Sequence, residues 1–338
     1  MNAWPPADKL FELGFGFAVS KVFLSAVELG VFTELNRAGA LDCEELGARL
    51  KIAKRGARDF FDALVAMGLL ERHDGRFANT PISDIYLVRG KPTYIGGLFE
   101  MANARLYGFW GALSEALRTG LPQNEIKHGE NLFDALYSDP SRLRLFLSAM
   151  TGLSLASAEA LALKFPWQQY RTFIDVGCAQ GCVPVRLALA HDHLRGGGFD
   201  LTEVGTIFND YVQAHGLAER LCFYAGNFLA EPLPSADVLI MGHILHDWDL
   251  DTKLMLLRKA HSALPTGGAL IVYEHMIDGE RRQNLYGLLM SLNMLIETTG
   301  GFDYTWDDLS AWMKDVGFAP TPAINLWGPQ WMVVGHKV

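Results

Sequence analysis

The stretch Phe173-Ile174-Asp175-Val176-Gly177-Cys178-Ala179-Gln180-Gly181 decides the fold of this chain. An apolar run that ends in an acid and a turn of small residues predicts a β-strand followed by a tight loop. The helical spacing of apolar residues from Val183 to Leu194 predicts that a helix comes next. In open α/β sheets this order places a ligand at the carboxyl end of the strand. We expect Asp175, Gly177 and Gly181 to contact that ligand.

Apolar strands alternate with helical segments from Arg171 onward, which predicts a parallel, doubly wound sheet. The expected strands are Thr172 to Val176, Gly198 to Leu201, Leu221 to Ala225, Ala236 to Met241 and Ala269 to Glu274, with helices beginning near Val183, Val204 and Asp251. The fold class is therefore α/β, with a Rossmann-like domain in the second part of the chain.

Two further signals follow the next strands of this sheet. Asp200 lies 19 residues after Gly181, the spacing at which a carboxylate bridges ribose hydroxyls. Glu203 is the alternative, because a run of three glycines before Asp200 makes a poor strand interior. After the third strand, Asn227 offers a polar side chain for an adenine amino group and Phe228 offers a ring to cover the base.

The residues before the sheet predict a separate, mainly helical domain. Apolar spacing indicates helices over 21–35, broken near Gly30, over 42–50 with Asp42 as its cap, and over 53–67. Asp74-Gly75 then predicts a hairpin turn. Three helices and a hairpin predict a winged helix, so we expect domains at 1–90 and 91–338. The second domain begins with an aromatic-rich helical segment suited to an acceptor pocket.

Composition bounds the partners. The chain has 338 residues, 50% of them hydrophobic and 20% charged, as soluble two-domain proteins do. A net charge of -9 argues against nucleic-acid binding, so the winged helix is interpreted as a packing or dimerisation module. The four cysteines suggest neither disulfides nor a zinc site, which fits a cytoplasmic protein. No uninterrupted apolar run reaches membrane-spanning length, so neither export nor membrane insertion is expected.

The segment Ile244-Leu245-His246-Asp247-Trp248 follows a strand and carries the chemistry. An imidazole titrates near neutral pH, which makes His246 the candidate general base. Glu274 ends a strand at the same edge of the sheet and is positioned to orient it, with Asp303 as a second carboxylate. Asp247 can instead cap a helix. His243, His261 and His275 are interpreted as structural, and His243 with His246 lacks a well-placed third ligand, so no metal is expected.

These motifs, with Phe199-Asp200-Leu201, Gly226-Asn227-Phe228 and the segment 299–305, resemble the plant-type and bacterial small-molecule O-methyltransferases, which include caffeic acid and acetylserotonin methyltransferases. The resemblance covers nearly the whole chain. It implies a class I fold, S-adenosylmethionine as cofactor and an obligate homodimer formed by the winged helix. It also implies methyl transfer to a hydroxyl of an aromatic or polyketide-like small molecule of secondary metabolism.

The resemblance also assigns residues. His246 would be the general base, flanked by Glu274 and Asp303. The implied cofactor-binding residues are Asp175, Gly177, Gly181, Asp200, Leu201, Asn227, Phe228 and Gly242. The implied residues of the acceptor pocket are Phe109, Trp110, Met150, Asp247, Met290 and Met294.

Several positions depart from the family pattern. Cys178 and Ala179 stand where the family has glycines, which adds volume near the ligand and predicts weaker cofactor binding. Asn227 replaces an aspartate, and Asp303 replaces a glutamate, which shortens its reach to His246. Two alternatives stay open: methylation of carbon by the same base, and a ligand-sensing or DNA-binding regulator without catalysis on the same scaffold.

Overall fold

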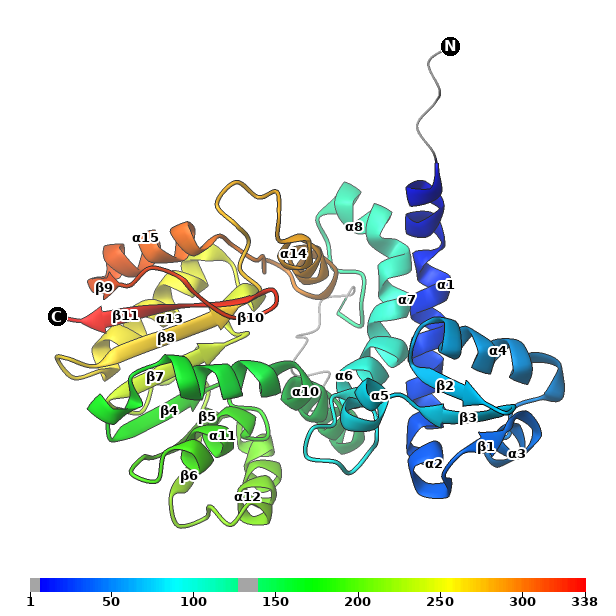
Figure 1. Cartoon of the computed structure of the whole chain (residues 1–338). Coiled ribbons are helices and arrows are strands. Elements are labelled where there is room, and N and C mark those ends of the chain that lie inside the picture. Colours follow the sequence, from blue (N-terminus) through cyan, green and yellow to red (C-terminus); the bar gives the residue numbers. More distant parts are fainter. Residues whose placement is uncertain (1–6, 127–138) are drawn as a thin grey trace. The chain divides into compact units, whose positions relative to one another are not determined.

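The computed structural model describes residues 7–126 and 139–338, without the side chains of residues 140 and 141. The six residues before Ala7, on which the expectation about export depends, lie outside this description. The chain divides into two compact units, Met1–Gly108 and Phe109–Val338 (Figure 1). The first compact unit extends past residue 90 to Gly108. The domain boundary expected after residue 90 stays a prediction.

The first unit is mainly helical and holds a small antiparallel sheet in the order β1-β3-β2. Its elements are α1 (Asp8–Glu28), α2 (Val31–Ala38), β1 (Leu41–Asp42), α3 (Cys43–Arg49), α4 (Lys54–Ala66), β2 (Leu70–His73), β3 (Arg76–Asn79), α5 (Pro81–Tyr86), α6 (Gly96–Met101) and a π-helical turn (Ala102–Leu106). Its core is built around Phe32, Phe61 and Leu64, which are fully buried.

Local sequence explains most of these elements. The Asp42 side chain accepts from the Glu45 N–H at 2.9 Å, and the Glu45 carboxylate accepts from the Asp42 N–H at 3.1 Å, so the predicted cap of α3 is confirmed. Asp74 and Gly75 both have positive φ in the β2–β3 turn, as the predicted hairpin requires. The first helix was predicted too late, because α1 already begins at Asp8.

The first half of α1 carries exposed apolar side chains around its whole circumference. Its large exposed side chains are Leu10, Phe11, Leu13, Phe15, Phe17 and Val19. By length and composition α1 could cross a membrane, and so could Arg142–Lys164, a result that the sequence analysis did not expect. The second of these segments contacts α11 and β10 within its own unit, as a core helix does.

The second unit is built on an eight-stranded sheet in the order β10-β11-β8-β7-β4-β5-β6, with β9 paired to β11. Its strands are β4 (Thr172–Val176), β5 (Arg195–Asp200), β6 (Leu221–Ala225), β7 (Val238–Gly242), β8 (Ala269–Glu274), β9 (Phe318–Pro320), β10 (Ile324–Trp327) and β11 (Gln330–Lys337). The central strands β4 to β8 are parallel, as predicted. The antiparallel strands β9 to β11 were not predicted.

Helices precede and connect these strands. They are α7 (Tyr107–Phe109), α8 (Leu113–Thr119), α10 (Pro140–Lys164), α11 (Cys182–Ala190), α12 (Gly205–Ala214), α13 (Leu250–Ala263), α14 (Leu285–Glu297) and α15 (Trp306–Val316), with short 3₁₀ turns at Trp110–Ala112, Trp167–Gln169, Thr202–Val204 and Leu245–Asp247. Figure 1 shows α11 and α12 on one face of the sheet, and α13 and α15 on the other.

The strand order positions a ligand site. After β4 the chain moves to β5 and β6 on one side and then returns to β7 on the other side of β4. Ligands of open α/β sheets bind at such a switch point, beyond the carboxyl ends of the strands. The strand β5 begins at Arg195 rather than at Gly198, because Gly196 and Gly197 pair in register with β4 and β6.

Candidate active site

The turn after β4 requires glycine at two of the predicted positions. Gly177 has φ of 71°, and a Cβ atom there would lie 2.2 Å from Ile244 Cδ1. Gly181 has φ of 95°, and its Cβ would lie 2.8 Å from the Phe208 ring. The Gly177 N–H donates to the Phe199 carbonyl at 2.8 Å, which ties the turn to β5. A side chain at either glycine would therefore displace the turn.

Cys178 and Ala179 are accommodated in different ways. Cys178 is buried, and a Cβ atom on Gly198 would lie 2.2 Å from its Sγ atom, so glycine at 198 makes the room that the thiol occupies. Burial and the neighbouring carboxylates raise the pKa of Cys178, so the thiol stays neutral. Ala179 has φ of 48°, a conformation that glycine adopts at lower cost. Weaker cofactor binding stays a prediction.

Two buried carboxylates lie at this turn. Asp200 accepts from the Ala179 N–H at 2.9 Å through Oδ2 and from the Leu201 N–H at 2.8 Å through Oδ1. Burial raises the pKa of Asp200 to about 6. Burial and the charge of Asp200 raise the pKa of Asp175 well above its usual range. A phosphate would be repelled here, whereas a ligand with an ammonium and a sulfonium would stabilise both carboxylates. The residues present therefore fit S-adenosylmethionine.

The remaining predicted cofactor residues lie close to this turn. Phe228 approaches the position of a Cβ on Gly177 to 3.8 Å. The Asn227 side-chain oxygen accepts from the Leu229 N–H at 2.9 Å and shapes the loop after β6. Gly242 ends β7, where a Cβ would lie 2.0 Å from the Tyr273 ring. The contacts of these residues with adenine stay predictions.

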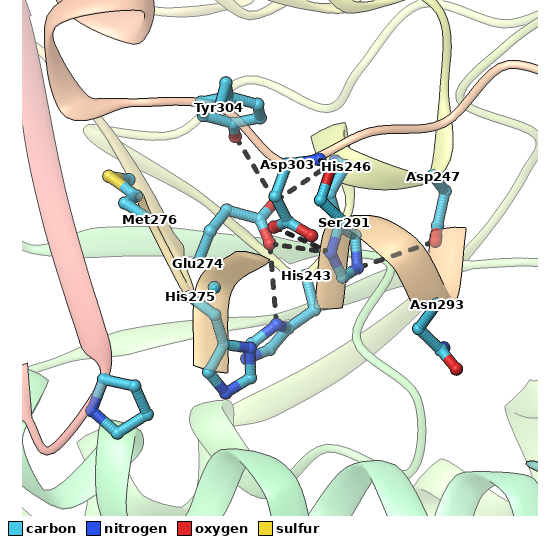
Figure 2. Close-up of polar contacts among 12 residues, drawn as sticks. His243, His246, Asp247, Glu274, His275, Met276, Ser291, Asn293, Asp303 and Tyr304 are labelled. Atoms are coloured by element: carbon cyan, nitrogen blue, oxygen red, sulfur yellow. Dashed lines mark hydrogen bonds and ion pairs between the residues drawn. The ribbon is translucent and has the colours of Figure 1, made fainter. Parts of the chain in front are cut away.

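The predicted acid–base residues come together in one buried cluster (Figure 2). His246 lies in the 3₁₀ turn after β7, Glu274 ends β8, and Asp303 lies between α14 and α15. The Nδ1 atom of His246 is 3.3 Å from Asp303 Oδ1 and 3.5 Å from Glu274 Oε2. On the other side of the ring, Nε2 is 3.5 Å from Asp247 Oδ1. The aspartate at 303 therefore does reach His246.

The cluster is strongly charged. Burial lowers the pKa of His246, but the three surrounding carboxylates outweigh it and raise that pKa to about 10. Burial raises the pKa of Asp303, whereas the charge of His246 and a contact with His243 lower the pKa of Glu274 despite its burial. Burial also raises the pKa of Asp247 to about 7. The resting cluster thus holds an imidazolium against an ionised Glu274.

Lys253 of α13 is a fully buried cation beneath this cluster, which the sequence analysis missed. Its Nζ atom donates to the Trp248 carbonyl and lies 3.5 Å from the centre of the Phe302 ring. Burial lowers the pKa of Lys253 to about 8, and the nearby carboxylates oppose that shift. Its charge offsets part of the cost of burying several acids together.

A polar chain of hydrogen bonds joins one predicted acceptor residue to α14. The Trp110 Nε1–H donates to Asn293 Oδ1 at 3.0 Å, and the Asn293 amide donates to Glu297 Oε2 at 3.0 Å. Met294 is buried, and Phe109, Met150 and Met290 are half-buried. Sequence reasoning missed Asn293 and Glu297. Their signal was a pair of polar residues four apart in a mainly apolar helix.

The sequence analysis expected no metal because His243 and His246 lacked a third ligand. In the structure Glu274 lies where such a ligand would be. Donor atoms of His243, His246 and Glu274, all buried, lie within 4.8 Å of one another. A pair of histidines and a carboxylate is a set that zinc accepts. Whether these atoms carry protons or a metal depends on the other hydrogen-bond partners of the two histidines.

The fold and this site together define an S-adenosylmethionine-dependent methyltransferase of the Rossmann-like class. Family models match an O-methyltransferase dimerisation domain over residues 11–89 and an O-methyltransferase domain over residues 110–319. The chain belongs to this O-methyltransferase family. The predicted family, reaction class and cofactor are confirmed.

Individual relatives align with nearly the whole chain. The tetracenomycin polyketide synthesis 8-O-methyl transferase TcmO of Streptomyces glaucescens is 40% identical and is covered over 97% of its length, with 98% of this chain. The N,N-dimethyltransferase OxyT of Streptomyces rimosus is 36% identical, with 98% and 96% of the two chains aligned. The crystal structure of human N-acetylserotonin methyltransferase with SAM has a TM-score of 0.91 at 27% identity, covering 100% of this chain and 99% of that one.

The role of Asp200 can be tested by calorimetric titration with S-adenosylhomocysteine. Replacing Asp200 with alanine removes charged hydrogen bonds worth about 1.5–3 kcal/mol each, so we expect affinity to fall by about tenfold to a hundredfold. Glu203→Ala is the matched control, because Glu203 is exposed in the next turn. Equal affinities for wild type and Asp200→Ala, with both proteins folded, would refute the assignment.

Proposed function

We propose that this protein transfers a methyl group from S-adenosylmethionine to a hydroxyl of an aromatic or polyketide-like small molecule, with His246 as the general base. The observation that carries the proposal is the cluster of His246, Glu274 and Asp303 at the same edge of the sheet as the glycine turn. The similarity to TcmO, a polyketide 8-O-methyl transferase, supports this class of acceptor.

When bound, S-adenosylmethionine supplies an electrophilic methyl group, so the remaining task is to position and deprotonate the acceptor. Glu274 and Asp303 hold the protonated Nδ1 of His246, so once the resting imidazolium has lost the proton on Nε2, that atom can take the proton of the hydroxyl. A phenol has an unperturbed pKa of about 10. The carboxylates that raise the pKa of His246 to about 10 match the base to such a hydroxyl.

Oxygen is the acceptor atom that the family favours, but the same base can serve another atom. OxyT, a relative at 36% identity, is an N,N-dimethyltransferase. NMR of the purified product separates an O-methyl signal from N-methyl and C-methyl signals, and an N- or C-methyl product would overturn the oxygen assignment.

We also propose a homodimer formed through the first unit. The exposed apolar part of α1 lies beside an apolar groove lined by residues of the same unit, among them Phe17, Val22, Leu29 and Phe60. Apolar patches of this kind mark protein interfaces, and the family model for residues 11–89 is a dimerisation domain. A partner chain would cover α1, and this use of the helix explains its apolar composition without a membrane.

The cellular setting is proposed on the same grounds. All four cysteines are free, as expected of a protein in a reducing compartment. TcmO, a relative at 40% identity, is a transferase of polyketide synthesis. We propose a cytoplasmic enzyme of secondary metabolism.

Replacing His246 with alanine removes the base. General-base catalysis contributes about 10²–10⁴-fold, so we expect kcat to fall by that factor while S-adenosylhomocysteine binds as in the wild type. Single-turnover methylation of an accepted phenol measures the rate. An unchanged rate would sink the proposed role of His246.

Replacing Asp303 with asparagine tests the electrostatics. Asp303 stabilises the imidazolium, so its loss lowers the pKa of His246, and the acid limb of kcat/KM against pH should move to lower pH. Asp249→Asn removes an equal charge at the cap of α13 and should leave the limb in place, since asparagine also caps helices. A shift of the Asp303→Asn limb to higher pH would contradict this account.

The dimer interface can be tested with Phe15→Asp, which places a charge in the exposed apolar part of α1, where Phe15 is 60% exposed. We expect light scattering after size exclusion to show a dimer for the wild type and a monomer for the variant. Leu163→Asp is the control, because Leu163 is 85% exposed on α10 in the other unit. A dimeric Phe15→Asp protein would place the interface elsewhere.

A further inference from the structure

The backbone of His243 has an energetically unfavourable conformation. Its φ is 56°, in the left-handed region, and its N–H donates to the Tyr273 carbonyl at 3.2 Å. Such a conformation is costly for residues other than glycine and persists where the surroundings compensate for it. The imidazole is buried and points into the cluster of Figure 2. The interpretation of His243 as merely structural does not account for this arrangement.

The buried side chain of Gln330 sets the proton positions. Strand β11 pairs antiparallel with β8 so that Trp331 is opposite Glu274, which brings the preceding residue, Gln330, beside the two histidines. Its Nε2 atom is 3.0 Å from Nε2 of His243 and 3.0 Å from Nε2 of His275. A primary amide has two N–H donors, one for each ring nitrogen. Both histidines are then neutral, with the proton on Nδ1.

The opposite orientation of the Gln330 amide is disfavoured by Glu274. The Nδ1 atom of His243 lies 3.5 Å from Glu274 Oε2, an acceptor that requires a donor. A proton on Nδ1 leaves Nε2 of His243 as an acceptor, so the NH₂ group of Gln330 must face it. Burial, together with the charge of His246, lowers the pKa of His275 to about 2, which agrees with a neutral ring there.

Glu274 is consequently surrounded by donors. Its Oε2 atom faces Nδ1 of His243 and Nδ1 of His246, each at 3.5 Å. Its Oε1 atom is 3.4 Å from the His246 backbone nitrogen and 3.4 Å from the Tyr304 hydroxyl. These contacts are long, as catalytic contacts often are before the acceptor binds. Two imidazoles thus converge on one carboxylate oxygen.

We propose that His243, held by Gln330 with its proton on Nδ1, is a positioning residue that keeps Glu274 ionised and turned toward His246. This inference rests on the proposed role of His246 as the base. The neutral His243 contributes a hydrogen bond without adding a charge that would compete with the imidazolium. His243 stabilises the Glu274 carboxylate most when His246 is neutral and no longer compensates its charge. Neutral His246 is also the state that takes the proton from the substrate hydroxyl.

The same geometry explains, without a metal, why donor atoms of His243, His246 and Glu274 lie close together. With protons on Nδ1 of His243 and of His246, neither nitrogen has a lone pair for a cation. The negative charge of Glu274 is already matched by the imidazolium of His246. A metal bound to these three residues would require both Nδ1 atoms to be unprotonated, which is the opposite proton distribution.

A matched pair of variants tests the proposal. Glycine at 243 suits the left-handed φ but lacks the donor, whereas asparagine tolerates that φ and places an amide N–H near the position of Nδ1. For His243→Gly we expect kcat to fall about tenfold and the acid limb of the pH profile to move to higher pH. For His243→Asn we expect both to return toward wild type. KM and S-adenosylhomocysteine affinity should change little.

The pH profile depends on every ionisable group around His243. These groups are Glu274, His275, Tyr273, His246, Asp247, Asp303, Tyr304 and Lys253. Asp303→Asn should move the same limb to lower pH, so the two variants are distinguished by sign. His73→Gly, in the exposed β2–β3 hairpin, is the control for a histidine substitution. A His243→Gly profile identical to wild type would overturn the proposal.

Two measurements on the protein alone complete the test. The ¹⁵N imidazole spectrum should show His243 protonated at Nδ1 and unprotonated at Nε2, and Gln330→Leu should abolish that preference. Stoichiometric zinc in the purified wild type, lost in His243→Gly, would overturn the proposal in favour of a metal site. If His246→Ala retains full activity, the proposed function fails; if only His246→Ala is impaired and His243→Gly is not, this inference alone fails.

Discussion

Burial of negative charge at the carboxyl edge of the parallel sheet is the constraint on which the rest of the structure depends. Asp175, Asp200, Glu274 and Asp303 are all buried there. An unpaired buried carboxylate costs several kcal/mol, so each of them needs donors or a countercharge. Asp200 obtains two backbone N–H groups from the glycine turn, and Glu274 obtains the imidazoles. The two halves of the site therefore solve one problem in different ways.

The two solutions correspond to two functions. At the turn, the backbone donors leave the pKa of Asp200 raised by burial, so the carboxylate still gains by meeting a positive ligand. At Glu274 the donors outweigh burial and the pKa is lowered, so the carboxylate is already satisfied and serves to orient His246. One edge of the sheet thus offers both a site that attracts a cationic cofactor and a preorganised base.

The sequence predicted the parallel strands well where they are nearly continuous apolar runs, whereas the start of β5, with its three glycines, was placed three residues too late. The bounds of β6 and β8 agree with the prediction, and His246, Glu274 and Asp303 do meet. The antiparallel strands β9 to β11 were missed, since Pro320, Gly328 and Pro329 interrupt the pattern there. That omission had a second effect. Gln330 reaches the site only through the pairing of β11 with β8, so without that strand His243 had no visible partner.

Backbone strain occurs at two positions next to the site. Ala179 and His243 follow the neighbouring strands β4 and β7, and both are non-glycine residues with positive φ. Each costs about 1–3 kcal/mol relative to a relaxed conformation. At 243 a glycine would relieve that strain but lose the contacts with Gln330 and Glu274. At 179 the methyl group makes no polar contact, and the backbone N–H that Asp200 uses would remain with glycine. The strain at 243 therefore accompanies a side chain that makes contacts in the site, whereas the strain at 179 accompanies a methyl group that makes none.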